Sequence, residues 1–347
     1  MLAGRGASYN PPNRFERRFV EPDPEAIDPD APGPPTELID DPSRSIIATN
    51  DSPDVGFDAS VNPYRGCSHG CSYCYARPTH EYLGYSAGLD FETKILVKRR
   101  APEMLREALA KPGWKPRVVA MSGVTDPYQP AERTLEITRG CLEVLRDFRN
   151  PVAMITKNRL VTRDADLLSE LAVHGAAGVY LSITSLDRSL QRVMEPRTST
   201  PTGRLEAIRA LAEAGVPVGV MVAPVIPGLT DHEVPAIVQA AADAGACAAG
   251  WTMLRLPHGV KELFEDWLEA HFPDRRERVL HRIREVRDGK LSDAEFRRRQ
   301  RGTGAYADQI AALFRAAVRR AGLPGMPALS AEAFRVPGTA RQLGLFA

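Results

Sequence analysis

The chain has 347 residues, of which 43% are hydrophobic and 26% are charged, with a formal net charge of +1. These values are ordinary for a soluble globular protein, and the length allows one large barrel or two modest domains. No segment approaches the ~20 uninterrupted apolar residues of a membrane helix, and the N-terminal residues contain no apolar run of signal-peptide length. We therefore expect a cytoplasmic protein with no membrane contact.

Residues 1–45 are polar and rich in proline. A segment of this composition buries too little apolar surface to offset the entropy that it loses on ordering. We therefore expect a Pro-rich N-terminal extension that is largely extended or mobile. The piece over residues 4–16 is less acidic than the part after it, which leaves open a second interpretation in which this piece packs on the core or reaches a substrate.

Residues 46–272 alternate between short apolar runs and amphipathic runs. The runs predict strands near 59–64 and at 118–121, 152–155, 178–183, 216–222 and 248–254, and helices over 132–148, about 162–175, 202–214, 231–244 and 260–270. Strands separated by helices of this length indicate parallel βα units with right-handed crossovers. Six units are too few for a closed eight-stranded barrel. The predicted fold is therefore α/β, a partial (β/α)6 TIM barrel with functional residues at the carboxyl ends of its strands.

Residues 273–323 are predicted to form a basic helical region, which ends in an amphipathic helix over about 305–321. Ten arginines crowd the stretch 274–301. Such a run is typical of a solvated helix face, but it also fits a surface that contacts the phosphates of a nucleic acid. The arginines are Arg275, Arg276, Arg278, Arg282, Arg284, Arg287, Arg297, Arg298, Arg299 and Arg301.

Cys67, Cys71 and Cys74 form a CxxxCxxC motif directly after the first predicted strand, and Tyr73 precedes the last cysteine. A short loop can turn three thiolates toward one centre. An iron–sulfur cluster of the cubane type takes four ligands, so a loop with three leaves one iron open to bind a small molecule. The spacing thus favours a catalytic iron–sulfur cluster.

Two other interpretations of the cysteines stay open. Structural zinc needs a fourth ligand, which His69, Cys141 or Cys247 could supply, although zinc modules usually pair their ligands and no second pair exists here. Cys141 falls on the apolar face of the predicted helix 132–148, which favours a core thiol. A disulfide is disfavoured in a reducing cytosol.

Cys67, Cys71, Tyr73 and Cys74 resemble the signature of the radical S-adenosylmethionine (radical SAM) enzymes. The resemblance implies a [4Fe–4S] cluster on the three cysteines, S-adenosyl-L-methionine (SAM) chelated to the open iron, and Tyr73 near the adenine. It further implies reductive cleavage of SAM to methionine and a 5′-deoxyadenosyl radical that abstracts a substrate hydrogen. An electron donor such as flavodoxin or ferredoxin is implied as a partner. The cofactor supplies the chemistry, and the protein orients it.

The loops after the next three strands are similar to those of the spore photoproduct lyase branch, over roughly residues 60–255. The resemblance implies that Thr125 and Asp126 help bind the methionine moiety. It places Lys157 and Ser182 near its carboxylate and the ribose, and it implies that Tyr75 returns a hydrogen atom. From the residues alone, the Asp126-Pro127 pair is equally typical of a plain turn.

One position departs from that branch. The lyase carries a hydrogen-donating cysteine three positions before the aspartate, and this chain has Gly123 there. The resemblance therefore implies a relative of the lyase. Glu195, Arg197 and Arg204 could clamp an anionic group of SAM or substrate, or form a salt bridge within a loop.

Residues 324–347 are predicted to be a tail. Its last residues resemble the bacterial sliding-clamp-binding peptide, in which Gln342 would hydrogen-bond the clamp while Leu343, Leu345 and Phe346 fill its pocket. Recognition of this kind concentrates its energy in a few apolar anchors. The alternative is a tail that docks on its own domain.

The sequence thus predicts a radical SAM enzyme that acts on DNA or another nucleic acid, in repair or modification. The motifs behind the nucleic-acid part are the lyase-like loops, the arginine run and the clamp-like tail. Two alternatives remain: radical chemistry on a peptide or small molecule, and a non-catalytic, metal-stabilised adaptor bound to the sliding clamp.

Overall fold

The computed structural model describes residues 2, 4–16, 33–121 and 123–338. Its central feature is a seven-stranded sheet in which six neighbouring strands are parallel and follow the order of the chain, with a short antiparallel strand at one edge. This arrangement confirms the predicted partial barrel of six βα units. The parallel strands are β3 (Ala59–Val61), β6 (Val119–Met121), β7 (Val152–Thr156), β8 (Ala177–Ser182), β9 (Val218–Val225) and β10 (Ala248–Met253), and β2 (Ile47–Thr49) pairs with β3.

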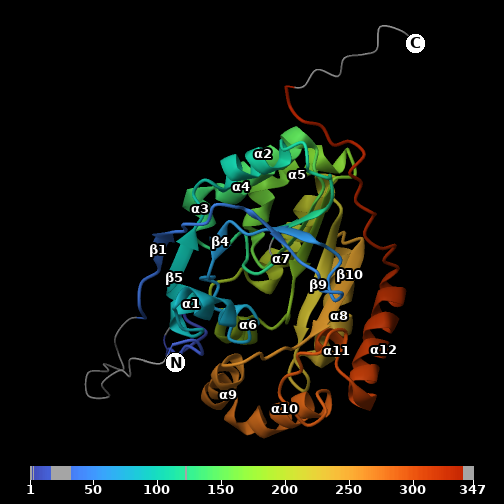
Figure 1. Cartoon of the computed structure of the whole chain (residues 1–347). Helices are drawn as coiled ribbons and strands as arrows, with labels where there is room; N and C mark the ends of the chain where they lie inside the picture. The colour runs from blue at the N-terminus through green and yellow to red at the C-terminus, as the bar shows by residue number, and fades with distance from the viewer. Residues whose placement is uncertain (1, 3, 17–32, 122, 339–347) are drawn as a thin grey trace.

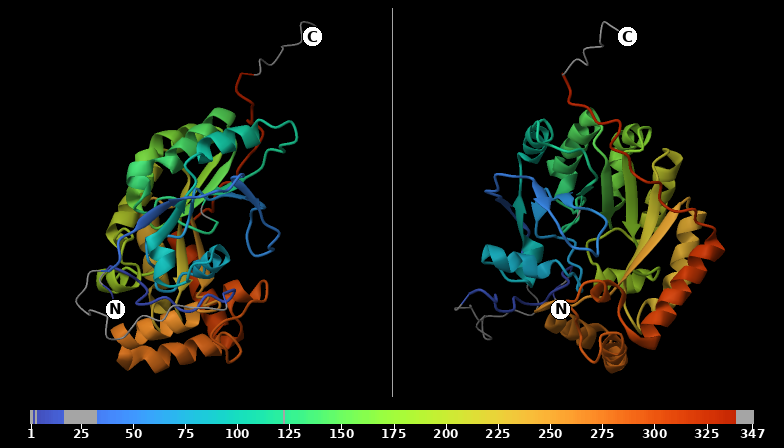
Figure 2. Two further views of the ribbon diagram at one scale, coloured as in Figure 1. Left: turned by 60° about the vertical axis from the view of Figure 1, so that its left-hand side comes forward. Right: turned by 45° about the vertical axis from the view of Figure 1, so that its right-hand side comes forward.

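Helices cover the outer face of this curved sheet (Figures 1 and 2). They are amphipathic, and their apolar faces supply side chains such as Leu142, Leu168, Ile208 and Ile237 to one large core beneath the strands. The main ones are α2 (Ala101–Leu109), α4 (Ile137–Phe148), α5 (Ala165–Ala172), α7 (Pro201–Glu213), α8 (Val234–Asp243) and α12 (Gly304–Ala321), which packs beside α8. Cys141 lies fully buried in this core, as the helical pattern predicts.

The helix predicted over 132–148 is two helices. A short α3 (Glu132–Leu135) ends at Glu136, whose φ of 52° interrupts the helix before α4 begins. The break lets the buried Glu132 carboxylate accept hydrogen bonds from the backbone N–H of Thr138 at 3.0 Å and Arg139 at 3.4 Å, while Arg163 pairs with it at 2.8 Å. A carboxylate at free N–H groups of a helix N-terminus is favourable. Sequence periodicity does not reveal this cap.

A second, three-stranded sheet that the sequence pattern does not predict lies beside the barrel. Its strands are β1 (Glu37–Asp40), β5 (Lys94–Val97) and β4 (Tyr64–Arg65), with β5 in the middle. The 3₁₀ helix η2 (Arg77–Leu83) and α1 (Leu89–Thr93) come between β4 and β5 in the chain. The cysteine loop connects β4 to η2 and lies between these two helices and the barrel.

Within the described parts of residues 1–45, residues 4–16 pack on the core, which is the second of the two interpretations given for this piece. Residues 33–45 include β1, which pairs with β5, and residues 4–16 run over the protein surface beside η2 and α1. Arg5 and Ala7 are buried, with 3% and 1% of their surface exposed. Polar contacts, rather than apolar ones, hold residues 4–16 in place, because their backbone N–H groups donate to a buried carboxylate, as described below.

The C-terminal third places two further helices at the carboxyl ends of the strands. The helices α9 (Val260–His271) and α10 (Pro273–Glu285) follow β10 (Figure 1). Their apolar side chains pack with Tyr73 and Leu254 in a second apolar cluster that includes Trp267. A short α11 (Arg298–Arg301) and then α12 follow. Residues 324–338 run back along the domain, with Gly325 N bonded to Cys247 O and Ser330 N to Gly175 O. Within the described residues, no helix is long and apolar enough to cross a membrane.

Candidate cluster and cofactor site

The cysteine loop between β4 and η2 is held by bonds to its backbone from several parts of the chain. Cys67 N donates to Phe91 O at 2.9 Å, Ser68 N to the side-chain oxygen of Gln129 at 2.9 Å, and Ser72 N to Met194 O at 3.0 Å. Gly66, with φ of 80°, begins the loop where a Cβ would stand 3.0 Å from two carbonyl oxygens. The loop conformation is therefore set by long-range contacts and a position that requires glycine.

A buried ion pair lies directly against the loop. Arg77 donates through Nε and Nη2 to Cys71 O, at 3.1 and 2.8 Å, and pairs with Glu92 at 2.5 Å. Both side chains are fully buried. Buried ion pairs of this kind persist only where hydrogen bonds satisfy the remaining polar atoms. Arg77 meets this condition through two further carbonyls, Ala87 O and Gly88 O.

Glu92 also holds the N-terminal strap, which we define as residues 4–16, through both carboxylate oxygens and its backbone oxygen. Gly6 N donates to Glu92 at 3.1 Å and Ala7 N at 2.9 Å, and the Arg5 guanidinium donates to the Glu92 backbone oxygen at 3.1 Å. Gly6 lies so close to the cysteine loop that a Cβ on it would stand 1.7 Å from Gly70 O. The strap therefore covers the loop from outside, coupled to Cys71 through Glu92 and Arg77.

The three cysteines are free thiols on this loop, with Cys67 and Cys71 buried and Cys74 partly buried. Burial raises the pKa of Cys71 well above its usual value, and it raises that of Cys74 to about 11. A coordinated metal reverses this preference, because it stabilises the thiolate. The Ser72 hydroxyl between them is buried and finds no hydrogen-bond partner in the described part of the chain. Three thiols with an unsatisfied donor among them fit a sulfide-containing cluster, whose sulfurs accept hydrogen bonds.

A single-metal centre fits less well. Among the described residues, no three His, Cys, Asp or Glu side chains stand in a geometry that holds one ion. In a cubane cluster, by contrast, each cysteine binds a different iron, so its thiols need not converge on one point. The candidate fourth ligands of zinc are also engaged elsewhere. Cys141 is in the core beneath the helices, Cys247 precedes β10 at the far end of the barrel, and His69 makes contacts through both ring nitrogens.

A polar cage stands at the carboxyl ends of β7 and β8. The Lys157 ammonium donates to Ser182 Oγ at 2.7 Å and to Ala223 O at 2.9 Å, and it lies 3.3 Å from Glu195. The same ammonium is 5.7 Å from the centroid of the Tyr73 ring. The structure thus brings Lys157, Ser182 and Tyr73 together, as the sequence predicts. In this arrangement Lys157 and Ser182 bind each other, and their contacts with SAM stay predictions.

Glu195 is the centre of this cage, and its role is internal. Its carboxylate accepts hydrogen bonds from Tyr73 Oη and from Thr184 Oγ1, the latter at 2.7 Å, and it pairs with the buried Arg204. Burial alone would raise the pKa of Glu195, but Arg204 and Lys157 hold it well below its usual value. Arg204 is therefore occupied by Glu195, which supports the salt-bridge interpretation of this segment over an anion clamp. Arg197 turns away to Gly4 O in the strap.

Asp126 and Thr125, predicted to contact the methionine moiety, are tied into the scaffold beside the loop. Asp126 accepts from Thr156 Oγ1 at 2.7 Å and Lys157 N at 2.8 Å, and it lies 3.4 Å from His69 Nδ1. Burial would lower the pKa of His69, but Asp126 and Cys67 raise it to about 10. Thr125 donates to Tyr64 O at 2.9 Å. Asp126 does more than make a turn, because it joins the end of β7 to the cysteine loop through His69.

Tyr75 lies at the open side of the loop with 49% of its surface exposed. Its hydroxyl donates to Gly123 O at 3.3 Å. The residue whose counterpart is implicated in hydrogen return thus faces the position where the lyase branch keeps its cysteine. Its role in catalysis stays a prediction.

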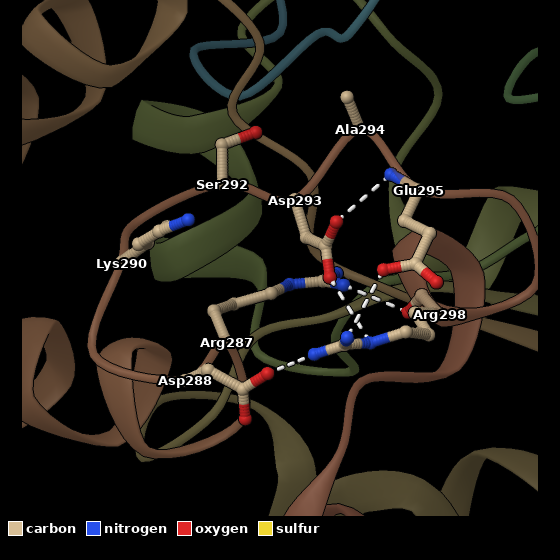
Figure 3. Close-up of a pocket in the computed structure, with 8 residues that line it drawn as sticks. All are labelled: Arg287, Asp288, Lys290, Ser292, Asp293, Ala294, Glu295 and Arg298. Atoms are coloured by element: carbon tan, nitrogen blue, oxygen red, sulfur yellow. Dashed lines mark hydrogen bonds and ion pairs between the residues drawn. The ribbon is translucent and has the colours of Figure 1, made fainter.

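Most of the predicted basic surface is paired within the protein. Figure 3 shows a pocket of about 170 Å³ in which Arg298 pairs with Asp288, Asp293 and Glu295, beside the buried Arg287. Elsewhere in the same stretch, further arginines pair with acids or bond to backbone oxygens. They are Arg276 with Glu265, Glu269 and Glu277, Arg282 with Glu285, Arg299 with Asp54, Arg278 with Gly228 O, and Arg301 with Trp251 O. The stretch is therefore a weak indication of phosphate binding.

Comparisons with known proteins decide the family. Residues 61–241 match the family model described as the radical SAM superfamily. The chain belongs to the radical SAM superfamily. An uncharacterised protein of Mycobacterium tuberculosis is 39% identical over 232 residues, which cover 66% of this chain and 67% of that protein. An uncharacterised protein of Methanocaldococcus jannaschii is 30% identical over 173 residues, 50% of this chain and 62% of that one.

The fold is that of spore photoproduct lyase in its main lines. A solved structure of that radical SAM enzyme with a dinucleoside spore photoproduct covers 83% of this chain and 80% of its own, with a TM-score of 0.54 and 17% sequence identity. A lyase variant matches with the same coverage and TM-score at 18% identity. At these identities the likeness concerns the fold, and the partial barrel predicted from the sequence is thereby confirmed.

Some site residues escaped the sequence analysis, and others lie outside the described residues. Arg77 and Glu92 were missed because isolated charges look like surface in a sequence, whereas the packing of residues 4–16 on the core was one of two interpretations left open. The sole available signal was the pair of charges Arg77 and Glu92 on either side of the short segment after the cysteines. The clamp-like residues Gln342, Leu343, Leu345 and Phe346 are not among the described residues.

Proposed function

We propose that the protein is a radical SAM enzyme that binds a [4Fe–4S] cluster through Cys67, Cys71 and Cys74 and acts on a nucleic acid. When bound, the reduced cluster supplies the electron that cleaves SAM into methionine and a 5′-deoxyadenosyl radical, which takes a hydrogen atom from the substrate. The observation that carries the proposal is the loop itself. Three thiols and an unsatisfied Ser72 hydroxyl stand beside the Lys157–Glu195 cage, at the carboxyl ends of the strands where barrels of this type bind their ligands.

The residues around the loop have distinct tasks in this proposal. Arg77 fixes the Cys71 carbonyl, so the loop keeps its path in the absence of regular secondary structure. Lys157 presents a cation that a carboxylate of SAM can share with Glu195, and Tyr73 offers a ring face beside that cation. The strap and the helices α9 and α10 cover the loop, which keeps water and oxygen from the cluster.

The nucleic-acid part of the proposal has narrower support. It is favoured by the fold shared with a lyase that has been solved with a dinucleoside spore photoproduct. Tyr75, half exposed at the open side of the loop, offers an aromatic face for a base. The arginine run gives little support, because most of it is paired internally. Gly123 argues against the lyase reaction itself, so repair or modification of a different lesion or base is proposed.

The test is anaerobic reconstitution with iron and sulfide. The protein should bind about four irons, the content of one cubane, and release 5′-deoxyadenosine from SAM under dithionite. Cys71→Ala should abolish both, whereas the matched control Cys247→Ala, at the far end of the barrel, should preserve both. A colourless, zinc-loaded protein that leaves SAM intact would support the metal-stabilised adaptor and overturn the proposal.

The substrate is tested with deuterated, irradiated DNA and unlabelled SAM. The 5′-deoxyadenosyl radical should take deuterium from the DNA, so deuterium should appear in 5′-deoxyadenosine or in SAM that is formed again from it. Release of 5′-deoxyadenosine without deuterium from any deuterated nucleic acid would leave the enzyme intact as a proposal and shift its substrate to a peptide or small molecule.

A further inference from the structure

Arg255 stands at the mouth of the barrel beside the cysteine loop. It is the second residue after β10, and its guanidinium carbon is 5.5 Å from the centroid of the Tyr75 ring. Tyr75 directly follows Cys74, so Arg255 lies on the side of the loop that remains open. The sequence analysis did not single out this arginine.

The Arg255 guanidinium has no hydrogen-bonding partner among the described residues, and its Nε is buried without one. The nearby carboxylate of Asp54 is already taken, since it accepts from the Arg297 backbone N–H at 2.5 Å and pairs with Arg299. Burial lowers the pKa of Arg255, and the positive charge of Arg299 lowers it further. A partly buried cation next to a second cation is unfavourable unless an anion joins it.

The fully buried arginines of this chain have partners for their terminal guanidinium nitrogens, even where, as in Arg287, the Nε has none among the described residues. Arg77 pairs with Glu92 and Arg204 with Glu195. Arg287, visible in Figure 3, donates to Arg298 O, Arg299 O and Leu254 O. The last bond fixes the backbone immediately before Arg255. The unpaired guanidinium is thus carried by a backbone that is held in place, which is the arrangement of a binding residue.

The neighbourhood favours a phosphate of a nucleic acid as the missing anion. Arg255 combines a forked donor, which matches phosphate oxygens, with the half-exposed ring of Tyr75. A cation next to an aromatic face is how proteins bind the backbone and the bases of single strands together. The SAM carboxylate is the weaker candidate, because the proposed function assigns it to Lys157, which stands against Tyr73 rather than Tyr75.

We propose that Arg255 is a substrate-binding residue that holds a backbone phosphate of an unpaired nucleic-acid strand, with the adjacent base against Tyr75. This inference deepens the proposed function and rests on its nucleic-acid part. It places the substrate strand over Tyr75 and Gly123, whose backbone oxygen bonds the Tyr75 hydroxyl.

The experiment measures binding of a fluorescent single-stranded DNA of about 16 nucleotides to the reconstituted full chain by anisotropy, over a range of salt concentrations. Arg255→Gln removes the charge and keeps a polar side chain. Arg275→Gln is the matched control, because Arg275 is exposed on α10 and the variant changes the charge equally. A second probe of the same sequence carries uncharged methylphosphonate linkages.

Arg255→Gln should weaken binding by about 10-fold, as expected for one charge-assisted bond, and reduce the slope of log K against log salt by about 0.7. Arg275→Gln should change affinity less than about twofold, as for a surface charge. Natural chain and Arg255→Gln should bind the methylphosphonate probe equally. Iron content and the Kd for SAM should match the natural chain, which shows that the variant is folded.

Each failure is distinct. If the natural chain binds DNA and Arg255→Gln binds it equally, the inference is wrong and the proposed function stands. An equal loss in both arginine variants would assign binding to diffuse charge and overturn the inference as well. If the natural chain binds neither DNA nor RNA, the nucleic-acid part of the proposed function fails and takes this inference with it. Weaker SAM binding with unchanged DNA binding would reassign Arg255 to the cofactor.

Discussion

Replacing Gly6 by alanine tests whether the N-terminal strap protects the cluster. The added Cβ would stand 1.7 Å from Gly70 O, 2.8 Å from Gly70 C and 3.0 Å from Ser72 N. Backbone atoms on both sides cannot yield by that much without moving the strap or the cysteine loop. Residues 5–7 are the part that can move, because they are held by the bonds of Gly6 N, Ala7 N and the Arg5 guanidinium to Glu92, whereas residues 9–14 keep their own bonds to η2 and α1.

The size of the effect follows from those contacts. Two hydrogen bonds to a charged group contribute roughly 3–6 kcal/mol together. Releasing residues 5–7 returns about 3–6 kcal/mol of backbone entropy. These two terms nearly cancel, so the steric overlap decides, and residues 5–7 should lift from the cysteine loop while the barrel stays folded. Each loss of about 1.4 kcal/mol in closing free energy raises the open fraction tenfold.

The measurement is the rate at which the reconstituted cluster bleaches in air, with hydrogen exchange of residues 4–16 as an independent readout. Gly6→Ala should bleach more than about 10-fold faster and lose protection in the strap, with little change in Tm. Gly113→Ala is the matched control, because a Cβ there meets nothing within 4 Å. If Gly6→Ala retains both the protected strap and the slow bleaching, the strap does not guard the cluster and the reasoning fails.

Three further changes test single residues or the tail. Lys157→Met should weaken SAM binding in equilibrium dialysis by roughly 10- to 100-fold, the value of one bond to a charged group; a lower Tm with an unchanged Kd would show that the ammonium only stabilises Glu195. Gly123→Cys puts a Cβ 3.3 Å from Ser60 Cβ, a close contact that a small shift of Ser60 relieves, so the variant should fold and place a thiol beside Tyr75. Product analysis should then show faster repair of spore photoproduct than by the natural chain, and equal rates would mean that position 123 does not separate this chain from the lyase. We propose that the last residues bind the sliding clamp. Removal of residues 342–347 should then end co-purification with the clamp and leave the iron content unchanged. Clamp binding that survives the truncation would refute the proposal.

The barrel could be predicted because its signals are local. Each strand is an apolar run of three to eight residues in the structure, followed by helical periodicity. The order of six such units fixes a parallel sheet, since right-handed crossovers leave few other arrangements. The polar residues at strand ends, Lys157 and Ser182, then had to meet at one edge of the sheet, which the structure confirms at 2.7 Å.

The surroundings of the cysteine loop could not be predicted, because they depend on pairs that are distant in the sequence. Gly6 and Glu92 are 86 residues apart, and Tyr73 and Glu195 are 122 apart. No periodicity links such residues. A glutamate in a polar segment has the same local pattern whether it is solvated or, like Glu92, fully buried.

The arginines show the same limit of sequence-based prediction, in that a binding surface was expected where the structure has paired charges. The run over 274–301 suggested a phosphate surface because charge density is visible in a sequence, whereas pairing is not. In the structure, Arg298 and Arg299 are neutralised by acids. Arg255 sits alone among apolar neighbours in the sequence, Leu254 and Leu256, and draws no attention there. Yet Arg255 stands over the Tyr75 ring with a buried Nε that has no hydrogen-bond partner among the described residues.

The two arginines beside the cysteine loop have different tasks, since one stabilises the loop and the other is available to the substrate. Arg77 is fully buried and satisfied, so it can hold the Cys71 carbonyl but can bind nothing else. Arg255 is partly buried, and beyond its contact with the Tyr75 ring its guanidinium has no hydrogen-bond partner among the described residues, so it is free to bind the proposed anion. A loop that must hold a cluster rigidly and still admit a substrate needs both kinds of residue. The closed side of the loop is therefore the side of Arg77, Glu92 and the strap, and the open side is that of Tyr75 and Arg255.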